Sequence, residues 1–169
     1  MYTASCLCGS VHLTVNSIIG LGICHCLTCR KMTSSAFSIN AAIRATDVIL
    51  ERGAPKSVSL TADCGTKSVL KICPDCGSPL WTEWSGMPEL RILKAGILDN
   101  VDGENVLERE ELRPKVEQFT TRRPDWLCAV EGSLQCEGQQ GARQTEDMMG
   151  DIEHGKAKKS PYELLKRKL

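Results

Sequence analysis

Apolar and polar residues alternate along several short stretches of the chain, a pattern typical of strands that bury one face. Residues 11–15 (Val-His-Leu-Thr-Val) alternate strictly, and residues 56–60, 67–72 and 89–95 are further stretches with strand character. Glycines separate these stretches, as they do at turns. The pattern predicts a mainly β domain of antiparallel sheets with short helices over residues 1–136.

Helical signals are few in this part of the chain. Residues 44–50 are a candidate for a short helix that begins near Thr46 or Asp47. After Cys136 the composition changes, because residues 137–160 carry almost no large apolar side chain. We therefore predict a polar, flexible tail over residues 137–169. The basic last residues can form a short helix, and a docking peptide is the alternative to a solvated tail.

Length and charge limit the classes of function. The chain has 169 residues, which fits one domain with a core of its own. Its 21 basic and 21 acidic residues give a formal net charge of zero, so we expect neither nucleic acid nor an anionic membrane as a partner. No stretch approaches the roughly 20 apolar residues of a membrane span. The first residues lack the features of a secretory signal, so we expect a cytoplasmic protein.

Ten cysteines are the most unusual feature of the composition. They admit two explanations, a disulfide framework or metal sites. Disulfides are rare in a reducing compartment, which is where we expect this chain. Metal binding is therefore the favoured interpretation, and zinc is the metal that thiolates bind most often in structural sites.

Four of the cysteines form two pairs that are each closed by a glycine. Cys6 and Cys8 precede Gly9, and Cys73 and Cys76 precede Gly77. A glycine at this position of a turn frees backbone N–H groups to point at the sulfurs. We predict that the four cysteines bind one structural zinc, since buried inert thiols would not explain the paired spacing.

A second group, Cys24, Cys26 and Cys29, lies within six residues, so one tight loop can present three sulfurs to one metal. Catalytic zinc sites have three protein ligands and an open fourth position for water or substrate. His25 is an alternative fourth ligand, although a side chain between two ligands tends to point away from the metal. It can equally line the site or have a structural role.

These motifs together resemble the glutathione-dependent formaldehyde-activating enzyme family, which includes the centromere protein V-like proteins. The similarity covers about residues 1–131 and includes the segment Lys94-Ala95-Gly96-x-Leu98-Asp99. It implies a single zinc-pinned domain of the β-tent type, with a structural zinc on the four paired cysteines. It also implies a catalytic zinc on Cys24, Cys26 and Cys29, and carbon–sulfur lyase activity on an adduct of glutathione or another thiol.

The resemblance also suggests which residues bind the small-molecule substrate. Arg30 and Lys31 follow the three cysteines and are the first candidates for binding the carboxylates of glutathione, with Lys94 a further one. The alternative for Arg30 and Lys31 is that they are solvated charges near the loop. Trp84 is a candidate for lining the pocket, whereas core packing is the better prediction for Trp81. A zinc-stabilised scaffold protein and a family member recruited to a biosynthetic pathway remain alternative functions. The sequence leaves the oligomeric state open.

Overall fold

The computed structural model describes residues 1–63 and 65–138, which form eleven strands in two sheets. The small sheet has the order β1-β2-β5, and the large sheet the order β11-β10-β3-β4-β9-β8-β7-β6. The strands are β1 (Tyr2–Ser5), β2 (His12–Val15), β3 (Gly20–Cys24), β4 (Ser38–Arg44), β5 (Val48–Arg52), β6 (Lys56–Thr61), β7 (Lys67–Ile72), β8 (Pro79–Trp84), β9 (Met87–Lys94), β10 (Pro114–Gln118) and β11 (Leu134–Cys136). The prediction of a mainly β protein is confirmed.

The four stretches predicted as strands correspond to β2, β6, β7 and β9. Most neighbouring strands are antiparallel, as expected, but β10 pairs in parallel with both β3 and β11. The large sheet is therefore mixed. The parallel pairs join segments that are far apart in the sequence, so alternation within one strand could not predict their direction.

The core lies between the two sheets because alternate residues of each strand point to it. In β2, Leu13 and Val15 are buried, and in β4 Ala41 and Ile43 are. The intervening β4 residues Asn40 and Ala42 point to the opposite face of the large sheet. That opposite face is where the candidate functional site lies.

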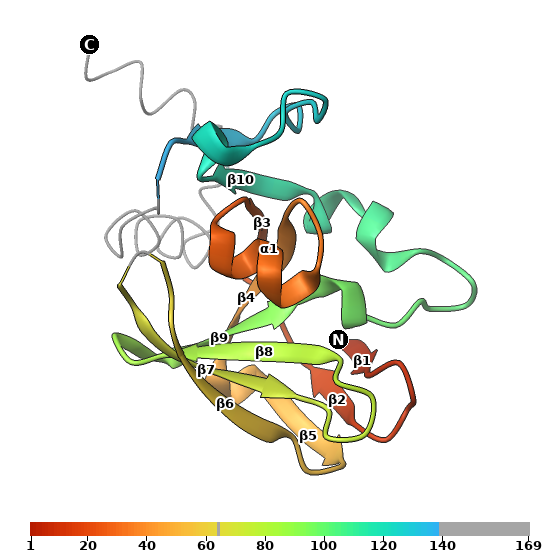
Figure 1. Cartoon of the computed structure of the whole chain (residues 1–169). Coiled ribbons are helices and arrows are strands. Elements are labelled where there is room, and N and C mark those ends of the chain that lie inside the picture. The colour runs from red at the N-terminus through yellow and green to blue at the C-terminus, as the bar shows by residue number, and fades with distance from the viewer. Residues whose placement is uncertain (64, 139–169) are drawn as a thin grey trace.

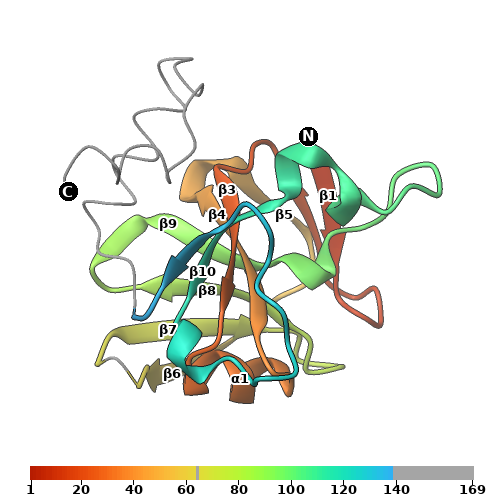
Figure 2. The same ribbon diagram turned by 90° about the horizontal axis from the view of Figure 1, so that it is seen from above.

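The described residues contain one α-helix, α1 (Leu27–Thr33), which directly follows β3 and lies above β8 and β9 in Figure 1. The other helices are short 3-10 turns: η1 (Ala45–Asp47), η2 (Ala95–Ile97), η3 (Val106–Glu108), η4 (Glu110–Leu112) and η5 (Thr120–Arg122). Seen from above, β1 and β5 lie to one side of the large sheet (Figure 2).

The predicted helix over residues 44–50 is mostly wrong. Only η1 is helical, and β5 begins at Val48. The β-branched Val48 and Ile49 favour extended backbone, and β5 pairs with β2. The predicted tail lies almost wholly outside the described residues, which end at residue 138. No helix among the described residues is long and apolar enough to cross a membrane.

Candidate metal centres and the adjoining cavity

The four paired cysteines come together in space. The sulfurs of Cys6, Cys8, Cys73 and Cys76 all lie within 4.8 Å of one another. The distance from Cys6 Sγ to Cys8 Sγ is 3.5 Å, and from Cys8 Sγ to Cys73 Sγ 3.8 Å. Four thiolates about 2.3 Å from a tetrahedral zinc would be about 3.8 Å apart. The group therefore fits a closed metal site with four sulfur ligands.

Both pairs lie on turns that require glycine. Gly9 and Gly77 have φ angles of 73° and 74°, in the left-handed region that side chains disfavour. Each glycine N–H donates to the carbonyl of the first cysteine of its pair, Cys6 or Cys73, at 2.9 and 3.0 Å. The two turns therefore close in a similar way, although Gly9 follows Cys6 by three residues and Gly77 follows Cys73 by four.

Hydrogen bonds favour the thiolate form of two cysteines in this group, Cys6 and Cys76. Burial raises the pKa of Cys6, but the amide of Val11, which donates to its sulfur at 3.2 Å, and the Ser10 hydroxyl together lower this pKa to about 7. The Ser78 hydroxyl and backbone amides lower the pKa of Cys76 to about 5. Thiolates are the form that binds a metal.

The second group is local in sequence. The sulfurs of Cys24, Cys26 and Cys29 lie within 4.8 Å of one another, at the junction of β3 and α1. Cys26 is the N-cap of α1, and its sulfur accepts a hydrogen bond from the Cys29 amide at 3.3 Å. The helix turn therefore orients the last two sulfurs, while the end of β3 positions Cys24.

Within the second group Cys29 has the strongest thiolate character. Hydrogen bonds with the sulfurs of Cys24 and Cys26 lower its pKa to about 3, and the positive charge of Lys94 and the Asn40 amide act in the same direction. The same interactions raise the pKa of Cys24. Lys94 is only 5% exposed and donates to Asn40 Oδ1 at 2.9 Å. The Lys94 side chain thus stands beside the sulfurs, where burial lowers its pKa and negative charge on the three cysteines acts in the opposite direction.

Asp63 holds the start of α1 from a distant turn. Its carboxylate accepts hydrogen bonds from the Leu27 amide at 3.2 Å and the Thr28 hydroxyl at 3.3 Å, and it forms an ion pair with Arg122. These contacts connect the β6–β7 turn, α1 and η5. The sequence did not predict α1 because its N-cap is a cysteine and Asp63 lies about 36 residues downstream.

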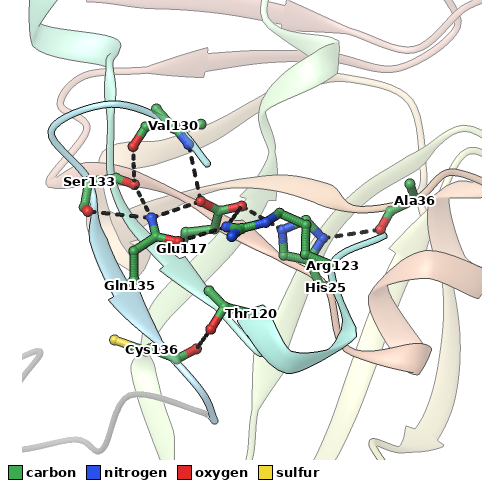
Figure 3. Close-up of polar contacts among 9 residues, drawn as sticks. All are labelled: His25, Ala36, Glu117, Thr120, Arg123, Val130, Ser133, Gln135 and Cys136. Atoms are coloured by element: carbon green, nitrogen blue, oxygen red, sulfur yellow. Dashed lines mark hydrogen bonds and ion pairs between the residues drawn. The ribbon is translucent and has the colours of Figure 1, made fainter. Parts of the chain in front are cut away.

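His25 does not join the three sulfurs. It is fully buried, and its Nε2 lies 2.7 Å from Glu117 Oε1 while its Nδ1 lies 3.3 Å from the Ala36 carbonyl oxygen (Figure 3). Each ring nitrogen therefore faces an oxygen atom rather than a sulfur. His25 is therefore not a metal ligand in this geometry, and it instead connects the cysteine loop to β10.

Glu117 is the centre of this buried network, which sequence reasoning missed. Its carboxylate also accepts from Gln135 Nε2 at 2.8 Å and from the Val130 amide at 3.2 Å, and Arg123 Nη1 lies 3.0 Å from Oε1 (Figure 3). Burial raises the pKa of Glu117, but the bonds from His25, Gln135 and Arg123 lower it to about 2. The network ties the loop of Cys24 and Cys26 to β10 and β11.

A cavity of about 160 Å³ adjoins the three-cysteine group. Its lining includes the three sulfur-bearing residues, together with Asn40 and Lys94, but none of the four paired cysteines. Most other lining side chains are apolar: Ile19, Met32, Leu60, Trp84, Ile92 and Phe119. The second cysteine group therefore borders a space in which a small molecule can bind, and the four paired cysteines do not line this cavity.

The remaining predicted site residues occupy different positions. Trp84 lines the cavity and Trp81 is part of the core, as expected. Arg30 and Lys31 lie on α1 but do not line the cavity. Lys31 is exposed, and Arg30 is partly buried with no hydrogen-bond partner for its Nε. Their predicted binding of carboxylates would have to occur outside the cavity.

The chain is therefore a mainly β protein with two cysteine groups that can each hold a metal ion. One of these groups borders a cavity. The family model of the glutathione-dependent formaldehyde-activating enzyme matches residues 1–122, and the chain belongs to this family. Among solved structures it is similar to a Rhodobacter sphaeroides protein, with 23% identity over 65% of this chain and 96% of that one, and a TM-score of 0.48. No curated protein matches the chain.

Proposed function

We propose that the protein is a zinc-dependent carbon–sulfur lyase that makes or breaks the bond between a thiol, such as glutathione, and an activated carbon, such as that of an aldehyde. The observation that carries this proposal is the position of Cys24, Cys26 and Cys29 in the wall of a cavity. Membership of the glutathione-dependent formaldehyde-activating family supports it. A reducing compartment, as in the cytoplasm, would keep the thiols available.

The two cysteine groups have different roles in this proposal. The four sulfurs of Cys6, Cys8, Cys73 and Cys76 saturate a structural zinc. The three sulfurs of the second group would bind a zinc with an open fourth position, and such a zinc lowers the pKa of a substrate thiol and stabilises its thiolate. The cavity beside this group would admit the substrate.

The protein residues around the second group would position the substrate. When an adduct breaks down, the carbon–sulfur bond breaks, its electron pair stays on sulfur, and the hydroxyl proton passes to water as the carbonyl forms. Lys94 is the charged group next to the sulfurs and would stabilise negative charge on sulfur or oxygen. Arg30 and Lys31 would bind the carboxylates of glutathione at the outer side of α1.

Cobalt substitution tests the proposal directly, because a new sulfur ligand changes the spectrum of the metal. Adding glutathione should raise the sulfur-to-cobalt charge-transfer band of the wild type, and this response should disappear in Cys26→Ser. Exchange between glutathione and its aldehyde adducts, followed by NMR, should be accelerated only when the response is present. No response to any thiol would favour the scaffold alternative.

The same titration tests the substrate-binding residues. Arg30→Ala and Lys31→Ala should each weaken glutathione more than a thiol that lacks carboxylates, because only glutathione offers them an anionic partner. The dissociation constants come from the cobalt spectrum. Equal losses for both thiols would assign Arg30 and Lys31 no part in recognising glutathione.

A further inference from the structure

The cavity follows one face of the large sheet away from the cysteines. In β9, Lys94, Ile92 and Leu90 all line it, as expected for alternate residues that share a face. Three alternate residues of a strand extend over about 13 Å. The cavity therefore reaches from the polar group beside the sulfurs to an apolar region farther along the strand.

Small residues create this space. Gly20 of β3 pairs with Ala42 of β4, and Ala42 pairs with Ile92 of β9. A Cβ atom added at Gly20 would have nothing within 4 Å. Two positions along the same strands, Gly22 pairs with Asn40, and Asn40 pairs with Lys94. The polar residues near the sulfurs are therefore followed directly by small and apolar residues on the same face of the sheet.

The chemistry of the lining favours an apolar occupant. Lys94 is the only charged side chain among the described lining residues, and its ammonium group already donates to Asn40. A carboxylate in this region would lose its hydration without gaining a cationic partner, because the polar lining residues Ser68, Thr82 and Gln118 offer only neutral hydroxyl and amide groups. The peptide part of a substrate such as glutathione would therefore lie outside the cavity.

We infer that the carbon half of the substrate carries an apolar group of about the size of a benzene ring, and that this group occupies the cavity between Gly20, Ala42 and Ile92. The whole cavity, its polar end included, has a volume of about 160 Å³, and an apolar protein cavity of about 150 Å³ is known to bind benzene, so the volume limits the group to at most this size. The inference rests on the proposed lyase function and names its substrate class, the thiol adducts of larger apolar aldehydes.

Kinetics with two glutathione adducts test this substrate class. The wild-type zinc protein should prefer the phenylacetaldehyde adduct to the formaldehyde adduct by about 10-fold or more in kcat/KM, given the selectivity of apolar pockets. Gly20→Leu should reduce this ratio by about the same factor, because its side chain fills the cavity. Gly86→Leu is the matched control, as Gly86 is exposed, does not line the cavity and has open space around it.

Binding of toluene tests the cavity without any turnover. Toluene should raise the melting temperature of the wild type and of Gly86→Leu, but not that of Gly20→Leu. Equal kcat/KM for the two adducts, unchanged in Gly20→Leu, would overturn the inference and leave the lyase proposal intact. If neither adduct is turned over, the lyase proposal fails. The toluene experiment then tests separately whether the cavity binds an apolar ligand. If toluene does not raise the melting temperature of the wild type, the inference about the cavity is wrong too.

Discussion

The two cysteine groups differ most in how their ligands are distributed along the chain. The four-sulfur group joins a turn at Cys6 and Cys8 to a turn at Cys73 and Cys76, and Cys73 lies 65 positions after Cys8. The three-sulfur group lies within one loop and the first turn of α1. The first group can connect distant parts of the chain, whereas the second group links only residues that are already close in the sequence.

This difference explains why the surroundings of the two groups are built differently. A metal in the four-sulfur group would hold the two turns together, in addition to the hydrogen bond from the Leu7 amide to Ser78 Oγ at 3.1 Å. The three-sulfur loop is held by protein contacts from distant segments, through the bond of His25 to Glu117 and the bonds of Asp63 to the start of α1. A site supported in this way can have its fourth metal position free and a cavity beside it, as a catalytic site requires.

The largest expected effect comes from Cys73→Ser. Cys73 is fully buried, and a structural zinc can contribute on the order of 10 kcal/mol to folding. Because net stability is only about 5–15 kcal/mol, we expect a largely unfolded protein with little bound zinc. Circular dichroism melts and elemental analysis measure this. The control is Cys128→Ser, which changes an exposed cysteine outside both groups.

Wild-type protein purified under reducing conditions should contain two zinc ions per chain, or somewhat fewer if the three-sulfur site loses metal. A folded Cys73→Ser protein with wild-type melting behaviour would contradict the structural role of the four-sulfur group.

The sequence was sufficient to predict both cysteine groups, because their ligands are encoded by short spacings and by Gly9 and Gly77. The strands at 11–15 and 67–72 were predictable from alternation for a similar reason, since each pattern is local. The parallel pairing of β10 was not, because strand order depends on contacts between distant segments.

The surroundings of the three-sulfur group were predictable only in part. Lys94 was noticed, but its burial beside the sulfurs depends on the pairing of β9 with β4. Glu117 and Asp63 gave no signal, because a single acidic residue in a sequence is usually a solvated charge. Their partners, His25 and Leu27, become adjacent to them only in the folded chain.

The second largest effect should come from Glu117→Gln, which tests whether protein contacts support the three-sulfur loop. Removing one partner of a buried ion pair typically costs about 3–5 kcal/mol, and it leaves His25 and Arg123 without their carboxylate. Urea unfolding measures the loss, with Glu110→Gln as an exposed control that also pairs with an arginine. The cobalt spectrum should change at the three-sulfur site. An unchanged spectrum would mean that Glu117 stabilises the fold without supporting the three-sulfur loop.

The pH dependence of this loss identifies its cause. The pKa of Glu117 is lowered to about 2 from the usual 4.5, so its stabilising effect is complete above about pH 4.5 and is lost as the pH falls towards 2. The difference in unfolding free energy between wild type and Glu117→Gln should therefore decrease as the pH falls from about 4.5 towards 2. A difference that does not change with pH would exclude the carboxylate charge as the cause.

The smallest effect on stability should come from Cys26→Ser, although it removes a proposed zinc ligand. Serine is a good N-cap, so its hydroxyl can still accept the Cys29 amide at the start of α1. We expect a folded protein with about one zinc per chain and a melting temperature within about 4 °C of the wild type, which corresponds to about 1 kcal/mol. Cys26→Ala removes the metal ligand and the cap together, and should cost about 1 kcal/mol more. If Cys26→Ser instead destabilises the protein as much as Cys73→Ser, the three-sulfur group is structural too, and the division between a closed site and an open one is wrong.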